Sequence, residues 1–264
     1  MSRTLAAGRV ETRLGEVAYV RTGRGPSLVL LHGNGHSWRE FAPALDVLAA
    51  HFDVVAWDMP GHGDSADAPA PPSIESYAGA LADLVAGLGL RRPAVLGSSV
   101  GAFIAASYAA DGGEVSALVL DEMQFRSRDW WLAAWPRVEQ MFGQPVQPLE
   151  AVQPRFCRLV DADLLDRWNH ERARTGAAGL IGVMAAIRDF DLAGALARLD
   201  LPCLLLFGAE GPTVDRAEAL AAAVPGATLA VVPRAGHFIS LDQPAAFAAA
   251  VVHFLQGPTE ASRS

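Results

Sequence analysis

Short, continuous apolar runs recur along this chain and alternate with longer segments in which apolar residues follow a helical spacing. Continuous apolar runs are typical of strands buried on both faces. They fall at residues 27–31, 53–57, 93–96, 115–120, 203–207 and 228–232. The segments with helical spacing predict helices at residues 39–50, 73–89, 102–110, 215–223 and 244–255. Strands that alternate with helices in this way predict a mostly parallel sheet covered on both faces.

Two further strands precede these runs. Residues 9–14 and 17–21 alternate between apolar and polar positions on either side of Gly15, which predicts an antiparallel hairpin at the edge of the sheet. The expected sheet therefore has eight strands. Two helix starts also carry capping signals, Ser73 for the second helix and an Asp215/Glu218 capping box for the fourth.

The pattern changes between residues 123 and 195. Strand-like runs disappear there, and helical segments are interrupted by Pro136, Pro145, Pro148 and Pro154. We interpret residues 123–195 as a helical cap domain inserted into a core domain formed by residues 1–122 and 196–264. Ligands of such sheets bind beyond the carboxyl ends of the strands, so chemistry is expected at those ends.

The strongest chemical motif is the G-x-S-x-G pentapeptide formed by Gly97, Ser99 and Gly101. A buried strand precedes it and a helix of small residues follows, which is the context of a nucleophile elbow. The two glycines let strand and helix approach closely, and the helix N-terminus favours an anionic intermediate. We therefore predict Ser99 as the nucleophile; Ser98 is excluded by the glycine spacing.

With this elbow the sequence resembles the α/β-hydrolase superfamily, and the resemblance covers nearly the whole chain. It implies that a histidine after the last strand acts as the general base, which indicates His237. Gly236 before it allows the backbone to direct the imidazole toward Ser99. Other histidines, such as His51, His170 and His253, fall on helices and are interpreted as structural or surface residues.

The carboxylate that orients His237 is harder to assign. In most relatives it follows the seventh strand, but Gly211 and Pro212 occupy the expected positions and Glu210 lies one residue too early. Asp121 and Glu122, at the end of the sixth strand, are the alternative.

The chain is similar to the zearalenone (resorcylic acid lactone) lactonases. It shares with them an Asp-Met-Pro-Gly run at 58–61 and a Gly-Ala-x-x-Pro-Thr run at 208–213. That resemblance implies Glu122 as the acid, ahead of Asp121 and Glu210.

The tetrahedral intermediate needs backbone N–H donors. We predict the N–H of Val100 as one donor and that of Gly33 or Asn34 as the other. His32 and His36 are four residues apart, but without a third ligand on this glycine-rich loop we expect no metal site and no cofactor. His32 is expected to brace the loop.

Aromatic residues are concentrated in the predicted cap. We expect Trp130, Trp131 and Trp168, together with Met123, to bind an apolar or aromatic part of the substrate. The alternative interpretation is that large residues such as these form the core of the cap itself.

Composition narrows the classes of partner. The chain of 264 residues carries a formal net charge of −8, which argues against binding to nucleic acid or to an anionic membrane. Two cysteines far apart, and no apolar signal-like run in residues 1–15, lead us to expect a cytoplasmic protein. A homodimer is compatible with the sequence.

These observations predict a serine hydrolase that cleaves a small apolar or aromatic carboxylic ester or lactone through an acyl-enzyme. The resemblance implies a zearalenone-type macrolactone as one substrate. Two alternatives stay open. One is hydrolysis of a C–C bond in a vinylogous diketone by the same triad, and the other is a non-catalytic small-molecule receptor on this fold.

Overall fold

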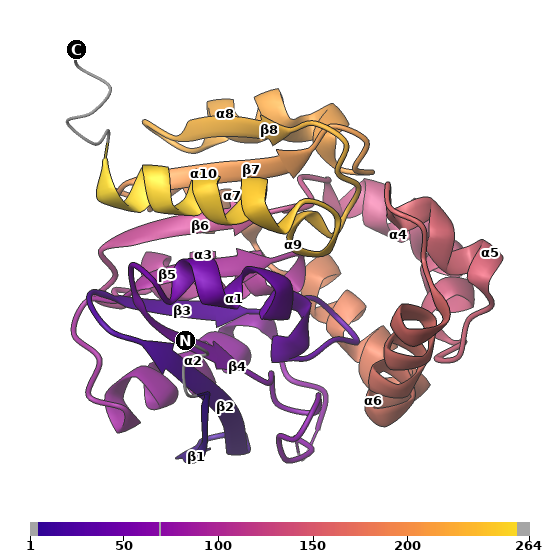
Figure 1. The fold of residues 1–264 in the computed structure, drawn as a ribbon. Coiled ribbons are helices and arrows are strands. Elements are labelled where there is room, and N and C mark those ends of the chain that lie inside the picture. The colour runs from indigo at the N-terminus through magenta and orange to yellow at the C-terminus, as the bar shows by residue number, and fades with distance from the viewer. Residues whose placement is uncertain (1–4, 69, 258–264) are drawn as a thin grey trace.

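An eight-stranded, mostly parallel sheet forms the centre of the protein, as predicted (Figure 1). The computed structural model describes residues 5–68 and 70–257. Residues 1–4, 69 and 258–264 lie outside the described residues. Both ends of the predicted core domain therefore lie outside them, as do the first four residues of the segment 1–15, for which no signal peptide was expected. The strands are β1 (Ala6–Thr12), β2 (Gly15–Gly23), β3 (Ser27–Leu31), β4 (Asp53–Trp57), β5 (Ala94–Ser98), β6 (Ala117–Asp121), β7 (Cys203–Gly208) and β8 (Thr228–Val232).

The strand order is β1-β2-β4-β3-β5-β6-β7-β8. Only β2 runs antiparallel to its neighbours, β1 and β4, and this arrangement confirms the predicted edge hairpin. The hairpin is longer than the alternation indicated, because β2 pairs along its second half with β4 as well as with β1. Strands β5, β6 and β7 are buried along their whole length, which is the reason for their continuous apolar sequences.

Helices cover both faces of the sheet. On one face lie α1 (Ala42–Leu48) and α10 (Pro244–Gln256), with α9 (Ile239–Asp242) between them and the site. On the other face lie α2 (Ile74–Gly87), α3 (Val100–Ala110) and α8 (Ala217–Ala223). The apolar faces of these helices and of the sheet form two large cores, one on each side of it.

Two predicted helices are interrupted at their starts. The segment predicted as a helix at 39–50 begins with a 3₁₀ turn, Trp38–Phe41, and α1 starts beside Pro43, which lacks an N–H and suits a first helical turn. The predicted Asp215/Glu218 capping box is wrong: a second 3₁₀ turn, Val214–Arg216, precedes α8, and the Asp215 carboxylate binds Arg126 at 2.7 Å instead. The predicted Ser73 cap is correct, since its hydroxyl accepts the N–H of Ser76.

Between β6 and β7 the chain leaves the sheet and forms helices only. They are α4 (Arg128–Phe142), α5 (Leu149–Val152), α6 (Ala162–Asp189) and α7 (Leu192–Ala197). We call residues 123–195 the helical insertion. The long α6 is kinked at Gly176, where φ is 71°. Helix α7 crosses residue 195 and packs on α3 and α8, so the last predicted boundary falls inside a helix.

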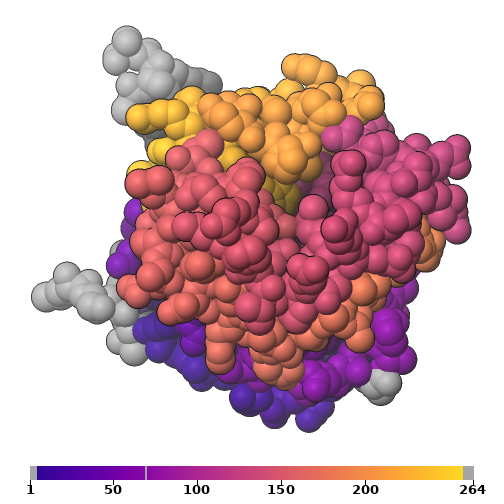
Figure 2. Space-filling model, turned by 90° about the vertical axis from the view of Figure 1, so that its right-hand side faces the viewer, coloured from indigo at the N-terminus to yellow at the C-terminus, as the bar shows by residue number. Residues whose placement is uncertain are grey.

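Seen from the side of the insertion, its residues cover most of the surface (Figure 2). Segments that follow β7 form the upper rim of this face, and a recess opens where the two meet. This recess lies beyond the carboxyl ends of the parallel strands. No helix in the described part of the chain has the length and apolar character that crossing a membrane requires.

Candidate active site

Ser99 occupies the sharp turn between β5 and α3. Its backbone dihedrals are φ 52° and ψ −115°, a conformation that non-glycine residues adopt only where the surroundings impose it. The Ser99 N–H donates to the carbonyl of Asp121 at 2.8 Å, which ties the turn to β6. A Cβ on Gly97 would collide with the backbone of Gly101, and one on Gly101 with the carbonyl of Leu31. The two glycines are therefore required for the turn, and Ser99 is presented at the N-terminus of α3.

Glu122 and His237 are brought together from the ends of β6 and β8. His237 Nδ1 lies 3.2 Å from Glu122 Oε2, and the Glu122 side chain is fully buried. Three groups hold this carboxylate: the Gly208 N–H donates to Oε1 at 2.6 Å, and the Thr213 hydroxyl and the imidazole both approach Oε2. With φ 51°, Glu122 turns out of the strand direction to reach them.

The loop after β7 holds the acid from β6. A Cβ on Gly211 would lie 2.6 Å from Glu122 Oε1, so only glycine leaves room for the carboxylate at this position. Thr213 from the same loop donates to the same group. The loop after β7 thus forms the pocket of the Glu122 carboxylate.

The two alternative acids lie elsewhere. Glu210 is exposed, and its carboxylate lies 3.8 Å from Cys157 Sγ. Asp121 is fully buried on the opposite side of the strand end, and neither carboxylate oxygen has a hydrogen-bond partner in the described protein. Burial, together with the charges of Glu122 and Glu40, raises the pKa of Asp121 well above its usual range. The geometry therefore pairs His237 with Glu122 and keeps Asp121 away from it.

The loop that carries His237 is fixed by Asp242. This carboxylate accepts the N–H of Gly236 at 2.7 Å, and also those of Cys157 and Arg158 at 3.0 and 3.1 Å. The His237 N–H donates to the carbonyl of Arg155 at 3.0 Å. Because these bonds join the loop to the helical insertion, the insertion contributes directly to the position of the imidazole.

Residues 32–37, which we call the oxyanion loop after the donor predicted on it, lie against Ser99. A Cβ on Gly33 would be 3.5 Å from the Ser99 Cβ. The Gly33 N–H, however, donates to Glu40 Oε2 at 2.9 Å. Of the two predicted donors on this loop, Gly33 is therefore engaged, which leaves Asn34. The N–H of Val100 is at the first turn of α3, where backbone donors have no partner within the helix.

Two buried histidines brace the oxyanion loop. His32 Nε2 accepts the N–H of Met59 at 2.9 Å, so its proton is on Nδ1 and donates to the carbonyl of Gly33 at 2.7 Å. His62 Nε2 lies 3.3 Å from Asn34 Oδ1. Burial lowers the pKa of both imidazoles, and they are neutral at pH 7. Within the described residues, no three His, Cys, Asp or Glu side chains are grouped as a metal site requires.

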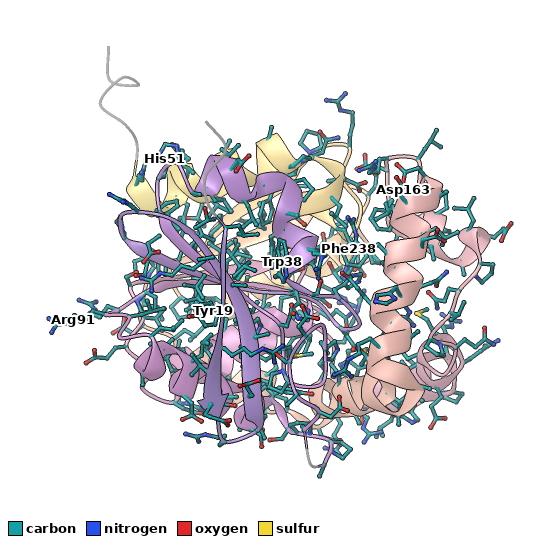
Figure 3. All side chains as sticks on the ribbon, turned by 60° about the horizontal axis from the view of Figure 1, so that its bottom comes forward. Tyr19, Trp38, His51, Arg91, Asp163 and Phe238 are labelled. Atoms are coloured by element: carbon teal, nitrogen blue, oxygen red, sulfur yellow. The ribbon has the colours of Figure 1, made fainter. Side chains whose placement is uncertain are left out.

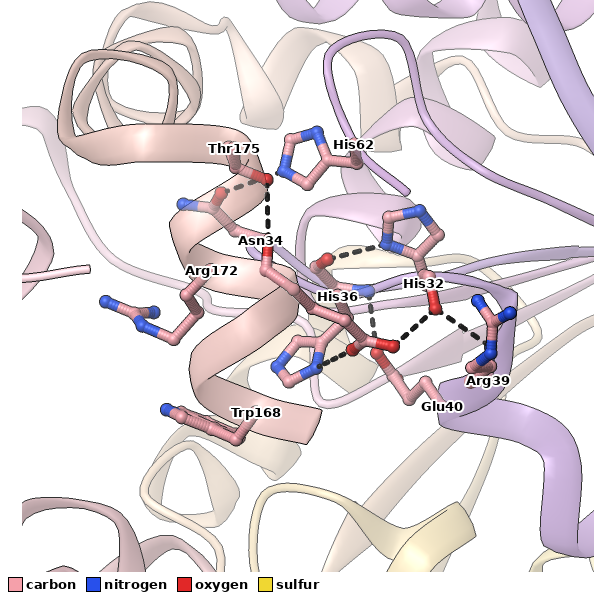
Figure 4. Close-up of polar contacts among 12 residues, drawn as sticks. His32, Asn34, His36, Arg39, Glu40, His62, Trp168, Arg172 and Thr175 are labelled. Carbon is pink, nitrogen blue, oxygen red and sulfur yellow. Dashed lines mark hydrogen bonds and ion pairs between the residues drawn. The ribbon is translucent and has the colours of Figure 1, made fainter. Parts of the chain in front are cut away.

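Helix α6 holds the oxyanion loop from the side of the insertion (Figure 4). The Ser37 hydroxyl donates to Glu171 Oε1 at 2.6 Å, and His36 Nδ1 lies 3.6 Å from Glu171 Oε2. The Asn34 side-chain amide donates to the carbonyl of Leu180 at 2.9 Å. Although burial opposes it, the nearby His36 imidazole and the hydrogen bond from Ser37 lower the pKa of Glu171. The loop that supplies the predicted oxyanion donor is thus built partly by the insertion.

A cavity of about 390 Å³ joins these groups. Ser99, His237 and Asn34 line its floor, and its walls are mainly apolar side chains of the insertion, including Trp130 and Trp131. This size and lining are typical of small-molecule sites.

The structure corrects two predicted substrate contacts. Met123 is fully buried in the core beneath the sheet end and does not line the cavity. Trp168 is 1% exposed and packs on Phe238 and His36, with ring-centroid distances of 5.4 and 4.8 Å. Phe238 lies where the core meets α6 (Figure 3). Trp168 therefore packs between core and insertion, whereas the alternative interpretation placed it in the core of the cap alone.

Sequence reasoning missed several residues that complete the site. Three of them make hydrogen bonds to predicted site residues or to the neighbours of these residues. Glu40 binds Gly33, Thr213 binds Glu122, and Asp242 binds Gly236 beside His237. The absence of an acid beside Thr213 was a usable signal, because it indicated that the loop after β7 has another task. Glu40 and Asp242 gave no signal, since each is one carboxylate on an ordinary amphipathic segment.

Comparison with known proteins identifies the family and agrees with the fold. A family model described as the alpha/beta hydrolase family matches residues 28–250. A pimeloyl-[acyl-carrier protein] methyl ester esterase from Stenotrophomonas maltophilia (strain K279a) is 32% identical over 251 residues, which are 89% of this chain and 94% of that protein.

Solved structures show the same fold. The esterase EaEST from Exiguobacterium antarcticum matches with a TM-score of 0.84 at 22% identity, over 96% of this chain and 100% of that one. The enol-lactonase from Burkholderia xenovorans LB400 matches with a TM-score of 0.81 at 24% identity, over 94% of this chain and 100% of that one.

Proposed function

Because this chain belongs to the alpha/beta hydrolase family, we propose that it is a serine esterase with Ser99, His237 and Glu122 as its catalytic triad. One observation carries the proposal: the buried Glu122 carboxylate contacts His237, and His237 shares a cavity with Ser99 on its strained turn. A receptor for small molecules has no need of this turn or of a buried acid held by three donors.

In the proposed mechanism His237 Nε2 takes the Ser99 proton while Oγ attacks the ester carbonyl. The N–H groups of Val100 and Asn34 stabilise the oxyanion, and Glu122 keeps the Nδ1 proton in place and stabilises the imidazolium. His237 then protonates the leaving alkoxide. Water attacks the acyl-enzyme with His237 as the base, which releases the acid and restores Ser99.

Two substrate classes have specific support. The Gly-Ala-x-x-Pro-Thr run at 208–213 and an acid at Glu122 are the sequence features that resemble the zearalenone lactonases, so a lactone of that type is one. A relative named as a methyl ester esterase makes simple methyl esters the other. Trp130 and Trp131 line the cavity and are proposed to contact the apolar part of either substrate.

The decisive experiment combines covalent labelling with a substrate panel. A fluorophosphonate should label Ser99 in the wild-type protein and nothing in Ser99→Ala, as located by peptide mass spectrometry. p-Nitrophenyl esters, methyl esters, aryl lactones and zearalenone are then tested as substrates. Absence of the adduct in the folded wild-type protein, with no ester cleaved, would favour the receptor. Cleavage of a vinylogous diketone in preference to every ester would favour the C–C hydrolase.

Three further features belong to the proposal. Residues 123–195 act as a cap domain over the core formed by residues 1–122 and 196–264. The protein forms a homodimer. It is located in the cytoplasm, with which the unpaired Cys157 and Cys203 are compatible. Analytical ultracentrifugation tests the dimer directly.

A further inference from the structure

The charge of the active-site cavity is opposite to the charge of the whole protein. The chain has a formal net charge of −8, yet the residues described as lining the cavity include three arginines and neither aspartate nor glutamate. The arginines are Arg126, Arg137 and Arg155. A neutral ester has no need of cationic walls, so these residues require a separate explanation.

The three arginines differ in their partners. Arg126 is neutralised by Asp215, whose carboxylate lies 2.7 Å away. Arg137 is exposed on α4. Arg155 is part-buried, and its guanidinium makes no ion pair or hydrogen bond with any described residue; it lies over the Trp168 ring, 5.1 Å from the centroid. Buried cations are normally paired with an anion.

Burial alone lowers the pKa of Arg155, to about 10, so the side chain remains a cation at pH 7. Arg172 also lies close to this tryptophan, 5.7 Å from the ring centroid. Arg172 is fully buried, its other donors bind carbonyls of the insertion, and its Nη1 atom has no partner among the described groups. Two cations without a counter-ion among the described residues therefore lie close to Trp168, and of these two only Arg155 lines the cavity.

The position of Arg155 is fixed relative to the catalytic groups. Its carbonyl accepts the His237 N–H at 3.0 Å, and Asp242 accepts the backbone N–H groups of Cys157 and Arg158 in the same segment. A Cβ on Gly236 would collide with this carbonyl, so the two segments are in close contact. The backbone that carries the Arg155 side chain is therefore held beside His237, and its guanidinium lies over Trp168 of α6.

We infer that Arg155 binds a carboxylate of the substrate, and that the preferred substrates are esters that carry a free carboxylate group at the far end of an apolar chain. A guanidinium presents paired N–H donors that match the two oxygens of a carboxylate. Trp130, Trp131 and Met184 form the apolar wall against which the intervening chain packs. This inference rests on the proposed ester hydrolysis at Ser99, and it adds the substrate class.

The test compares two esters that differ only in charge. Mono-p-nitrophenyl adipate and p-nitrophenyl hexanoate have the same acyl length, and only the first ends in a carboxylate. We expect the wild-type enzyme to prefer the charged ester, and Arg155→Gln to lose about 10- to 100-fold in kcat/KM for that ester, mainly through KM, with little change for the neutral one. Arg155→Lys should retain part of the preference.

Arg158→Gln is the matched control, since Arg158 lies three residues away on the same segment but pairs with Asp161 and does not line the cavity. It should preserve the preference of the wild type. Binding of monoethyl adipate and of ethyl hexanoate to Ser99→Ala, measured by calorimetry with and without Arg155→Gln, gives the same comparison without turnover. Circular dichroism checks that each variant is folded.

Equal kcat/KM values for the two esters in the wild type, or an equal loss on both in Arg155→Gln, would overturn the carboxylate site while leaving ester hydrolysis intact. Failure of the proposed function is distinct: neither ester is cleaved. In that case the calorimetric preference of Ser99→Ala for the charged ester still decides the inference.

Discussion

At the scale of single residues, the site depends on the different surroundings of two adjacent carboxylates. Asp121 and Glu122 follow each other at the end of β6 and point to opposite sides. The Glu122 carboxylate contacts donors on Gly208, Thr213 and His237, whereas the Asp121 carboxylate has no hydrogen-bond donor among the described residues. The surroundings, and not the acidity of the side chains themselves, assign the two roles.

Glu122→Gln should reduce kcat on the order of 10⁴-fold. The carboxylate accepts on both oxygens, but an amide has only one acceptor oxygen, so either Gly208 or the Thr213 and His237 side loses its acceptor. Steady-state kinetics on a p-nitrophenyl ester measures the effect. Asp121→Asn is the matched control and should retain kcat within about 10-fold, because it does not contact His237; the reverse ranking would reassign the acid.

Asp121 also predicts a dependence of stability on pH. Its pKa is raised in the folded protein, so above about pH 4 the unfolded chain releases a proton that the folded chain keeps. The free energy of unfolding therefore falls as the pH rises, until Asp121 ionises in the folded state. Asp121→Asn should gain stability relative to the wild type between pH 5 and pH 8, as measured by urea unfolding. Parallel curves for the two proteins would contradict this.

At the scale of elements, the oxyanion loop is held by contacts from three directions. Glu40 binds its Gly33 N–H from the 3₁₀ turn before α1, His32 and His62 brace it from within the core, and Glu171 holds it from α6. A glycine-rich loop has little intrinsic preference for one conformation. Its geometry is therefore a property of its neighbours.

Glu40→Ala should lower kcat by about 10- to 100-fold with a small change in KM, because it releases the Gly33 N–H and lets the predicted Asn34 donor move. Glu40→Gln keeps an acceptor oxygen and should recover most of the activity. Initial rates over a range of ester concentrations separate the two parameters. If Glu40→Ala keeps the kcat of the wild type, the loop does not depend on this bond.

At the scale of the whole molecule, the insertion and the core share one packing unit around Trp168. Phe156 and Trp168 of the insertion meet Phe238 and Leu241 of the core in a small cluster. Phe238 follows His237 directly, so this cluster also supports the catalytic loop. The insertion is consequently part of the stability of the active site as well as its cover.

Trp168→Ala should reduce the free energy of unfolding by about 3–5 kcal/mol, because it leaves a large cavity between core and insertion. Trp130 is the matched control: it lines the active-site cavity and is 43% exposed. Trp130→Ala should cost less than about 1 kcal/mol but raise KM for an aromatic ester. Urea unfolding and steady-state kinetics on both variants test the pair, and equal losses of stability would contradict the division of roles.

The sequence by itself determined the fold and the elbow. Buried parallel strands must be continuously apolar, and only glycine permits the close contacts at Gly97 and Gly101. Local residue patterns therefore predict both the fold and the elbow. The resemblance to known families indicated His237 and placed Glu122 ahead of Asp121 and Glu210, which the empty acid position after β7 had left open.

Only the tertiary structure decided which residues support the site and which of them line its cavity. Glu40, Asp242 and Arg155 act on residues 7 or more positions away or across the boundary of the insertion, and Met123 and Trp168 proved to be core. Such roles depend on which chain segments meet in space. No periodicity or motif along the chain predicts these contacts, because they arise from packing between elements distant in sequence.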